Sequence, residues 1–218
     1  MKDKHLTRRI IQYALGLIAM ALGAVLLKQA YLGISPITSL PAAVADITPF
    51  TLGNTTIALH ALCVIGQIIL VRRITLKSIL TLFVGVPFGY MIDGLMLIIP
   101  ATSAIVLRFV YLLFGIVFQG FGVRIIVGSD LMLPAPDELT HTISQVFGKK
   151  LSNVKFASDA VYVVLALAID LIFTHRVSSV GIGTVLSVLL TGRFVGWFTQ
   201  WFPKLTLPPF WSVGKEKE

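Results

Sequence analysis

Leu52-Gly-Asn-Thr-Thr-Ile-Ala-Leu-His-Ala61 and Leu151-Ser-Asn-Val-Lys-Phe-Ala-Ser-Asp-Ala160 are two stretches that share a leucine, an asparagine and two alanines at the same spacing. Each matched residue of the second stretch lies 99 positions after its mate in the first. The same offset relates three pairs outside these stretches: Gly16 and Gly115, Gly23 and Gly122, and Leu40 and Leu139. Because glycines and an asparagine align as well as the leucines, the sequence predicts two related halves.

The composition predicts a membrane protein. The chain has 218 residues, of which 56% are hydrophobic and only 13% are charged, whereas a soluble domain averages about 25% charged residues. A transmembrane helix needs about 20 apolar residues, and six stretches qualify: about 10–32, 54–71, 78–99, 104–127, 154–174 and 179–202. The first stretch is too long for a cleaved signal peptide and lacks a cleavage motif. We therefore expect an all-α protein with six transmembrane helices.

Three spans per half is an odd number, so the second half is expected to lie upside down in the bilayer. The sequence thus predicts a 3+3 inverted repeat, with residues 1–100 and 101–218 as its two parts within one membrane domain. In transporters of this design, small solutes bind between the halves near the bilayer midplane.

The net charge of +8 has a simple explanation in this arrangement. Most basic residues fall on one side of a six-span protein, and only Arg108 and Arg176 fall on the other. This is the positive-inside pattern, which predicts cytoplasmic termini, and we expect no nucleic acid partner. Cys63, the single cysteine, excludes a disulfide and a cysteine-based metal site. We expect neither a metal nor another cofactor.

Two longer connections follow the first and fourth spans, at equivalent places in the repeats. In the first, Ser35 suits a helix N-cap and Pro36 a first helical turn. In the second, Pro134 or Pro136 has this role, and Asp137 and Glu138 follow in the first turn, where the helix dipole favours acids. Each helix is too short to span. It is either re-entrant, which requires surrounding protein or a watery cavity, or amphipathic and lying at the surface. The repeat symmetry favours the re-entrant alternative.

These segments also carry a family resemblance. Leu32-Gly-Ile-Ser-Pro-Ile-Thr38, Leu52-Gly-Asn-Thr55 and Tyr90-Met-Ile-Asp-Gly94 resemble the first-half pattern of the YczE/YyaS/YitT group of bacterial membrane proteins. Asn153-Val-Lys-Phe-Ala-Ser-Asp159 and Val180-Gly-Ile-Gly-Thr184 resemble its second half. The similarity covers nearly the whole chain and is greatest to the YczE branch. It implies a multi-pass protein of the bacterial plasma (inner) membrane and brings little function. The sequence departs from the pattern at Thr38, where many members have an acid, and at Arg193, where many have a proline.

Arg193 is the deepest cation in the predicted spans, nine residues or ~14 Å of helix from the end of the last one. It therefore requires a buried acid, a watery cavity or an anionic ligand. As a site residue, its guanidinium would bind a carboxylate, sulfonate or phosphate through two parallel bonds. As a structural residue, it would pair with Asp159 or Asp93.

The other candidate residues lie on the spans and on the starts of the short helices. His60 and Asp159 are mates across the repeat, and because histidine changes charge near neutral pH, they are candidates for proton coupling. The alternative for His60 is a structural residue that bonds a neighbouring backbone carbonyl. Asp93 faces the cavity or caps a helix break. Free N–H groups at helix starts bind polar groups well. This property and the repeat predict four further binding residues: Ser35, Thr38, Asn54 and Asp137.

Several polar and small residues receive structural roles. We expect Lys28 and Arg124, near span ends, to extend to the interface, and Asp170 to pair with Arg176 or His175. Glycine faces on spans one, four and six predict close helix packing. Gly85, Pro87 and Gly89 predict a kink or hinge in span three.

The sequence therefore predicts a transporter or permease-like protein that binds a small polar or anionic solute between its halves. The alternative is a regulator or scaffold that binds a partner protein or lipid and transports nothing. We expect no enzyme, because no nucleophile lies beside a base. Membrane lipids and the solute are the expected partners, and a homodimer stays open.

Overall fold

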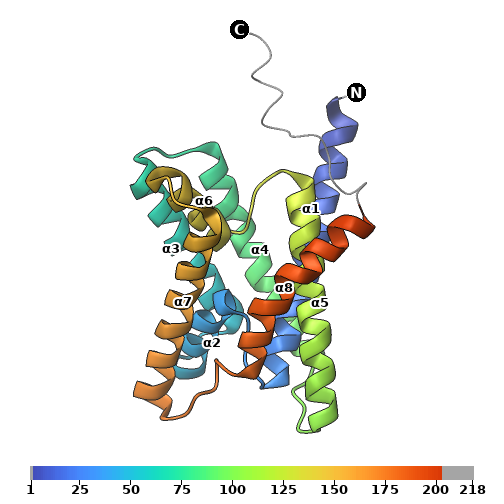
Figure 1. The fold of residues 1–218 in the computed structure, drawn as a ribbon, viewed down its shortest axis with the longest axis vertical. Helices are drawn as coiled ribbons and strands as arrows, with labels where there is room; N and C mark the ends of the chain where they lie inside the picture. Colours follow the sequence, from blue (N-terminus) through green and yellow to red (C-terminus); the bar gives the residue numbers. More distant parts are fainter. Residues whose placement is uncertain (1, 203–218) are drawn as a thin grey trace.

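A computed structural model describes residues 2–202 of the chain, with side chains from Leu6 onward. The described part is all-helical (Figure 1). Its elements are α1 (Lys2–Ala30), α2 (Pro36–Ile47), α3 (Leu52–Val71), α4 (Leu76–Ile98), α5 (Ile105–Ser129), α6 (Ala135–Phe147), α7 (Leu151–Ile169), the π-helical turn η1 (Asp170–Thr174) and α8 (Ile182–Trp201).

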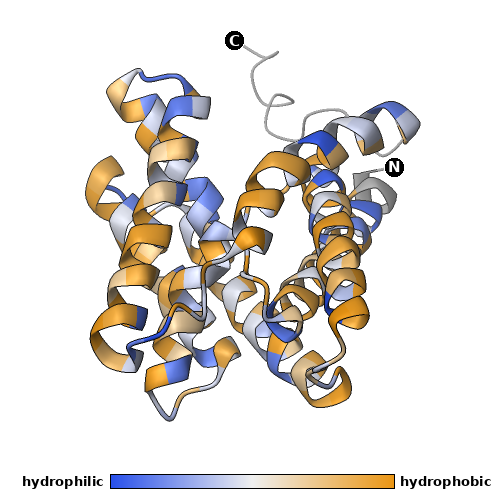
Figure 2. Ribbon diagram, turned by 60° about the horizontal axis from the view of Figure 1, so that its bottom comes forward, coloured by the Kyte–Doolittle hydropathy of each residue, from blue (hydrophilic) through white to orange (hydrophobic). Residues whose placement is uncertain are grey.

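Six of these helices are long and apolar enough to cross a membrane, which confirms the six predicted spans. They are α1, α3, α4, α5, α7 continued by η1, and α8, and they provide 20 to 25 residues each. Hydrophobic residues dominate these long helices, and hydrophilic residues concentrate at their ends and connections (Figure 2). Large apolar side chains also point outward, as at Phe83 (70% exposed) and Leu97 (90% exposed). This is the surface of a multi-pass membrane protein, whose outer faces contact lipid.

Helices α1 and α5 form the central pair and run antiparallel. At one end Arg9 donates to the Ser129 carbonyl oxygen (2.9 Å), and at the other Gln29 donates to the oxygen of Ile99, the C-cap residue of α4 (2.8 Å). Glycines line their crossing. A Cβ atom at Gly122 would lie 2.8 Å from the Gly16 oxygen, and one at Gly23 would lie 2.8 Å from the Gly115 oxygen. The predicted close packing of the glycine faces is confirmed.

The other helices complete two groups (Figure 1). In one, α8 packs on α5 of the central pair, and in the other, α2, α3, α6 and α7 pack together. Helix α4 packs on both α1 and α3 and joins the groups. Gly85 lies against the His60 ring, and a Cβ at Gly89 would collide with the Gly53 oxygen at 2.6 Å. These two glycines therefore let α4 approach α3, and α4 continues as one helix through Pro87. They act in packing, and the predicted kink or hinge stays a prediction.

Both predicted short segments are helices. Ser35 is the N-cap residue of α2 and Pro36 follows it, as predicted. Helix α6 has Pro134 as N-cap and both predicted acids in its first turn. Each short helix crosses to the other half: α2 packs on α7, and α6 packs on α3. Their starts are thereby held between the two groups of spans.

Candidate functional site

A cavity of about 600 Å³ lies where the two groups of helices meet. All eight α-helices contribute to its lining, from Met20 of α1 to Val195 of α8. The first turns of both short helices reach it, through Pro36 and Thr38 of α2 and Pro136 and Asp137 of α6. The prediction that both helix starts approach one central cavity is confirmed.

At the start of α2 the polar groups bind one another. The Ser35 hydroxyl lies 2.8 Å from that of Thr38 and accepts a hydrogen bond from the Gln119 amide of α5 (3.3 Å). Ser35 therefore does not cap the helix through its side chain, although it occupies the N-cap position. All three side chains are less than a tenth exposed and line the cavity. They form a neutral polar wall with a hydroxyl pair at its centre.

At the start of α6 the polar groups are charged. Lys155 of α7 lies 2.9 Å from Asp137 Oδ1 and 2.9 Å from Asp159 Oδ1. Asp159 is one helical turn from Lys155, so both side chains lie on the same face of α7. Asp159 thus pairs with Lys155 and not with Arg193. These three residues form the charged cluster of the cavity.

His60 of α3 lies on a separate part of the lining. Its side chain is buried (5% exposed), and its ring stacks on Phe88 of α4 with 5.6 Å between centroids and 8° between planes. Among the described side chains, none provides the His60 ring with a hydrogen bond. The cavity thus contains both members of the predicted His60–Asp159 pair.

Most of the remaining lining is apolar. It includes side chains from α3, α4, α5 and α8, among them Leu59, Phe88, Ile92, Val123, Ile126, Val188 and Val195. Such a combination of a large apolar surface with a few convergent polar groups is typical of a binding site for a small molecule.

Three of the predicted binding residues lie outside this lining. Asn54 is exposed in the first turn of α3, where its backbone N–H donates to the Thr51 hydroxyl (3.1 Å). Asp93 accepts from that hydroxyl (2.6 Å) and from the Gly53 N–H (2.8 Å), so it caps α3. Arg193 is exposed on α8.

Lys155 and Gln119 line the cavity and contact predicted site residues, although the sequence did not predict either of them as a site residue. Lys155 belongs to the basic residues that the positive-inside pattern places at the membrane surface, but it lies within α7 and lines the cavity. Its position four residues before Asp159 was the signal that would have identified it. Gln119 is the repeat mate of Met20, and nothing in its apolar neighbourhood distinguishes it in sequence.

Two backbone segments pair beside Ser35 of the cavity lining, and we call this end of the molecule the closed end. Residues 31–35 and 178–183 pair through hydrogen bonds from Ile34 N–H to the Ser179 oxygen (3.2 Å) and from Gly183 N–H to the Leu32 oxygen (2.7 Å). Gly33 has φ +103°, and a Cβ there would collide with the backbone of Gly181. Only glycine permits this approach.

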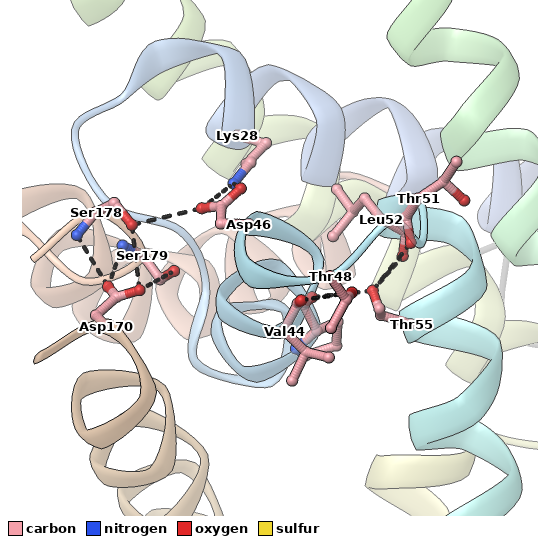
Figure 3. Close-up of polar contacts among 11 residues, drawn as sticks. Lys28, Val44, Asp46, Thr48, Thr51, Leu52, Thr55, Asp170, Ser178 and Ser179 are labelled. Atoms are coloured by element: carbon pink, nitrogen blue, oxygen red, sulfur yellow. Dashed lines mark hydrogen bonds and ion pairs between the residues drawn. The ribbon is translucent and has the colours of Figure 1, made fainter. Parts of the chain in front are cut away.

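A polar network holds this closed end (Figure 3). Asp170 is fully buried and accepts hydrogen bonds from the N–H groups of Ser178 (2.9 Å) and Ser179 (2.8 Å). The Ser178 hydroxyl lies within reach of both Asp170 and Asp46, and Asp46 pairs with Lys28 at 2.7 Å. These contacts replace the predicted pairing of Asp170 with Arg176 or His175 and the predicted extension of Lys28 to the interface.

The wall between α7 and α8 is open. Within residues 2–202 these two helices do not pack along each other, whereas α3 and α4 do. Phe156 of α7 and Val188 of α8 both line the cavity and are 72% and 47% exposed. In Figure 1 the two helices diverge away from the closed end.

The comparisons with known proteins add a family. The chain is 25% identical, over 191 residues, to the uncharacterized protein YyaS of Bacillus subtilis (strain 168), which covers 86% of this chain and 90% of that protein. No solved structure matches. Residues 7–200 match DUF6198, a family of unknown function. The match covers most of the chain and the whole cavity lining, so the chain is a member of the DUF6198 family.

Proposed function

We propose that this protein is a membrane transporter that binds a small polar solute in the central cavity, between two inverted repeats. The observation that carries the proposal is the composition of the cavity lining. Ionisable residues inside membrane spans are costly and mark solute or ion pathways, and Lys155, Asp159 and His60 all lie in spans and line one cavity. A packed scaffold has no use for such groups around an empty space.

Contacts at the α1–α5 crossing support the inverted repeat. A Cβ at Gly16 would meet the Gly122 oxygen and the Ile126 side chain, and a Cβ at Gly115 would meet the Gly23 oxygen and the Leu27 side chain. Every residue of the second set is the repeat mate, at an offset of 99, of a residue of the first. A contact that recurs between the repeat mates of the same two residues is what a two-fold axis between the halves would produce.

Two further contacts agree with the same axis. The Cys63 sulfur lies 3.5 Å from the Tyr162 hydroxyl, and these residues are 99 positions apart. Two mates can touch only where the axis passes between them. The packing of α2 on α7 likewise exchanges with the packing of α6 on α3.

One difference between the two halves breaks this symmetry and supports transport. Helices α3 and α4 pack together, but their counterparts α7 and α8 do not. Since the end near Gly33 and Gly181 is closed, the cavity is accessible from one side. In alternating access, one repeat moves against the other around a fixed site, and the opposite state would separate α3 from α4 and join α7 to α8.

The distribution of charge supports an orientation. Arg72, Arg73, Lys149 and Lys150 lie at the same end of the spans as the start of α1. We propose that this end is cytoplasmic, that both termini lie there, and that the opening between α7 and α8 faces it. The membrane is the bacterial plasma membrane, and the chain belongs to the YczE branch of its relatives.

Single-cysteine labelling tests transport without a known solute. In a Cys63→Ser background, Thr191→Cys places a thiol in the lining of the cavity. A transporter should expose it to an impermeant maleimide from the cytoplasmic side of oriented vesicles and, more slowly, from the external side. Ser103→Cys, exposed in the α4–α5 turn, should react from outside alone. Labelling of Thr191→Cys from one side only, under all conditions, would favour a scaffold.

A further inference from the structure

We infer that the solute is an amphiphilic organic cation, with an ammonium head at the charged cluster and an apolar body in the rest of the cavity. This inference rests on the proposed function and adds the class of substrate. Its basis is the sign of the charge that the cavity presents and the place where that charge lies.

The charged cluster carries one carboxylate more than it has cations. Asp137 and Asp159 both lie 2.9 Å from the single ammonium of Lys155. Among the described residues that line the cavity, Lys155 is the only lysine or arginine. Glu138, the next acid along, pairs with Lys77 at 2.7 Å and lies outside the lining. A partly buried surplus of negative charge favours a cationic ligand over an anionic one.

The geometry of the cluster also selects an ammonium. The Lys155 side chain occupies the space between the two carboxylates, so they already bind an alkylammonium group in this state. Its side chain is 36% exposed and therefore has room to move aside. A ligand ammonium can then bind Asp159 or Asp137 in its place, while Lys155 retains the other acid. Arg193, which would have favoured an anion, does not line the cavity.

The apolar part of the cavity accommodates the remainder of the ligand. A volume of about 600 Å³ lies within the range of sites for drug-sized molecules. The stacked rings of His60 and Phe88 provide a flat wall on which an aromatic or cyclic group can pack. The opening between α7 and α8 has apolar borders, at Phe156 and Val188, through which such a body can pass.

A matched series of naphthalene compounds tests the class of head group. Naphthylmethylammonium, naphthylmethanol and naphthoate share the ring and differ in charge, and their binding to the purified full-length protein can be measured by calorimetry. We expect the ammonium to bind most tightly. Asp159→Asn should weaken it about tenfold or more, since a charged hydrogen bond is lost. Asp93→Asn, an acid outside the lining, should leave it unchanged.

Two double variants, each with two substitutions in the charged cluster, separate the effect of charge on binding from an effect on folding. Asp137→Asn with Asp159→Asn leaves Lys155 without an acid and should abolish ammonium binding. Lys155→Met with Asp159→Asn keeps one unpaired acid and should retain it. Thermal unfolding of each variant identifies any that fail to fold, and the series on the unmodified protein is independent of them.

Three results would overturn the inference: tighter binding of naphthoate, no binding of the ammonium, or ammonium binding that survives loss of both acids. None of these affects the labelling of Thr191→Cys. Failure of the substrate class and failure of the transport proposal are therefore distinguishable.

Discussion

At the scale of single residues, Lys155 balances two acids that would otherwise repel each other. Removal of one partner from a buried ion pair strands a charge, which costs about 3–5 kcal/mol when burial is complete. The side chains of this cluster are 19% to 36% exposed, so solvent reduces the cost. Their arrangement therefore predicts unequal effects for its members.

Lys155→Met should destabilise the protein by about 1–3 kcal/mol, and Asp159→Asn should destabilise it less, because Asp137 still neutralises the lysine. Addition of Asp159→Asn to Lys155→Met should restore part of the loss, because a single acid remains. Thermal unfolding of the single and double variants in detergent measures this coupling. A double variant no more stable than Lys155→Met would show that the two residues act independently.

Asp170 and Asp46 provide a second comparison, at the closed end. Asp170 is fully buried, and its Oδ2 accepts from two backbone N–H groups while its Oδ1 accepts from two serine hydroxyls. Asp170→Asn would remove the charge from these bonds and turn the amide hydrogens toward the hydroxyls, at a cost of about 2 kcal/mol. Asp46 is a partly exposed partner of Lys28, and Asp46→Asn should cost less than about 1 kcal/mol. Unfolding midpoints compare the two variants. Equal losses would contradict the role assigned to Asp170.

At the scale of elements, glycines set how closely the helices approach. A Cβ at Gly122 would lie 2.7 Å from the Met20 backbone nitrogen, and one at Gly23 would lie 2.8 Å from the Gln119 nitrogen. Backbone atoms cannot move aside as a flexible side chain can. Gly122→Ala and Gly23→Ala should therefore each destabilise the protein by about 1–3 kcal/mol through overpacking. The two losses of stability should be similar if symmetry relates the two sites.

Gly94→Ala is the matched control for both. It adds the same methyl group within α4, where no atom lies within 4 Å of the new Cβ. Alanine also has the better helix propensity, by about 0.8–1 kcal/mol, so the variant should be neutral or more stable. Thermal unfolding ranks the three variants. A loss at Gly94 as large as that at Gly122 would mean that helix packing is not what these glycines provide.

The helices also show how much of the structure could be predicted from the sequence. Hydropathy sufficed for the six spans, and proline at a helix start sufficed for α2 and α6, because both signals are local. The position of Arg193 along α8 gives its depth, but the direction of its side chain depends on how α8 rotates against its neighbours. Packing decides that rotation when every face of a helix is apolar. His60, Asp137 and Asp159 line one cavity, and the predicted repeat pointed to this grouping because a repeat relates distant segments.

At the scale of the whole molecule, the charges at the two ends of the spans determine the orientation in the membrane. The end that contains the start of α1 also contains the α3–α4 and α6–α7 connections, with Arg72, Arg73, Lys149 and Lys150. The opposite end contains Arg108 and Arg176 as well as Lys28, which Asp46 neutralises. Because basic connections stay in the cytoplasm, we expect the end that contains the start of α1 to be cytoplasmic and the closed end to face outward.

Reporter fusions test this orientation and the inverted repeat together. A fusion after Arg73 should be cytoplasmic, and one after Ser103 should be external, because one span separates them. A fusion after Lys150 decides the relation between the halves. Four spans precede it, so it should be cytoplasmic, and the last two spans then return the chain to the same side. If α6 crossed the membrane as a full span, the Lys150 fusion would be external. The two halves would then have the same orientation in the membrane, and a two-fold relation between mates such as Gly16 and Gly115 would be impossible.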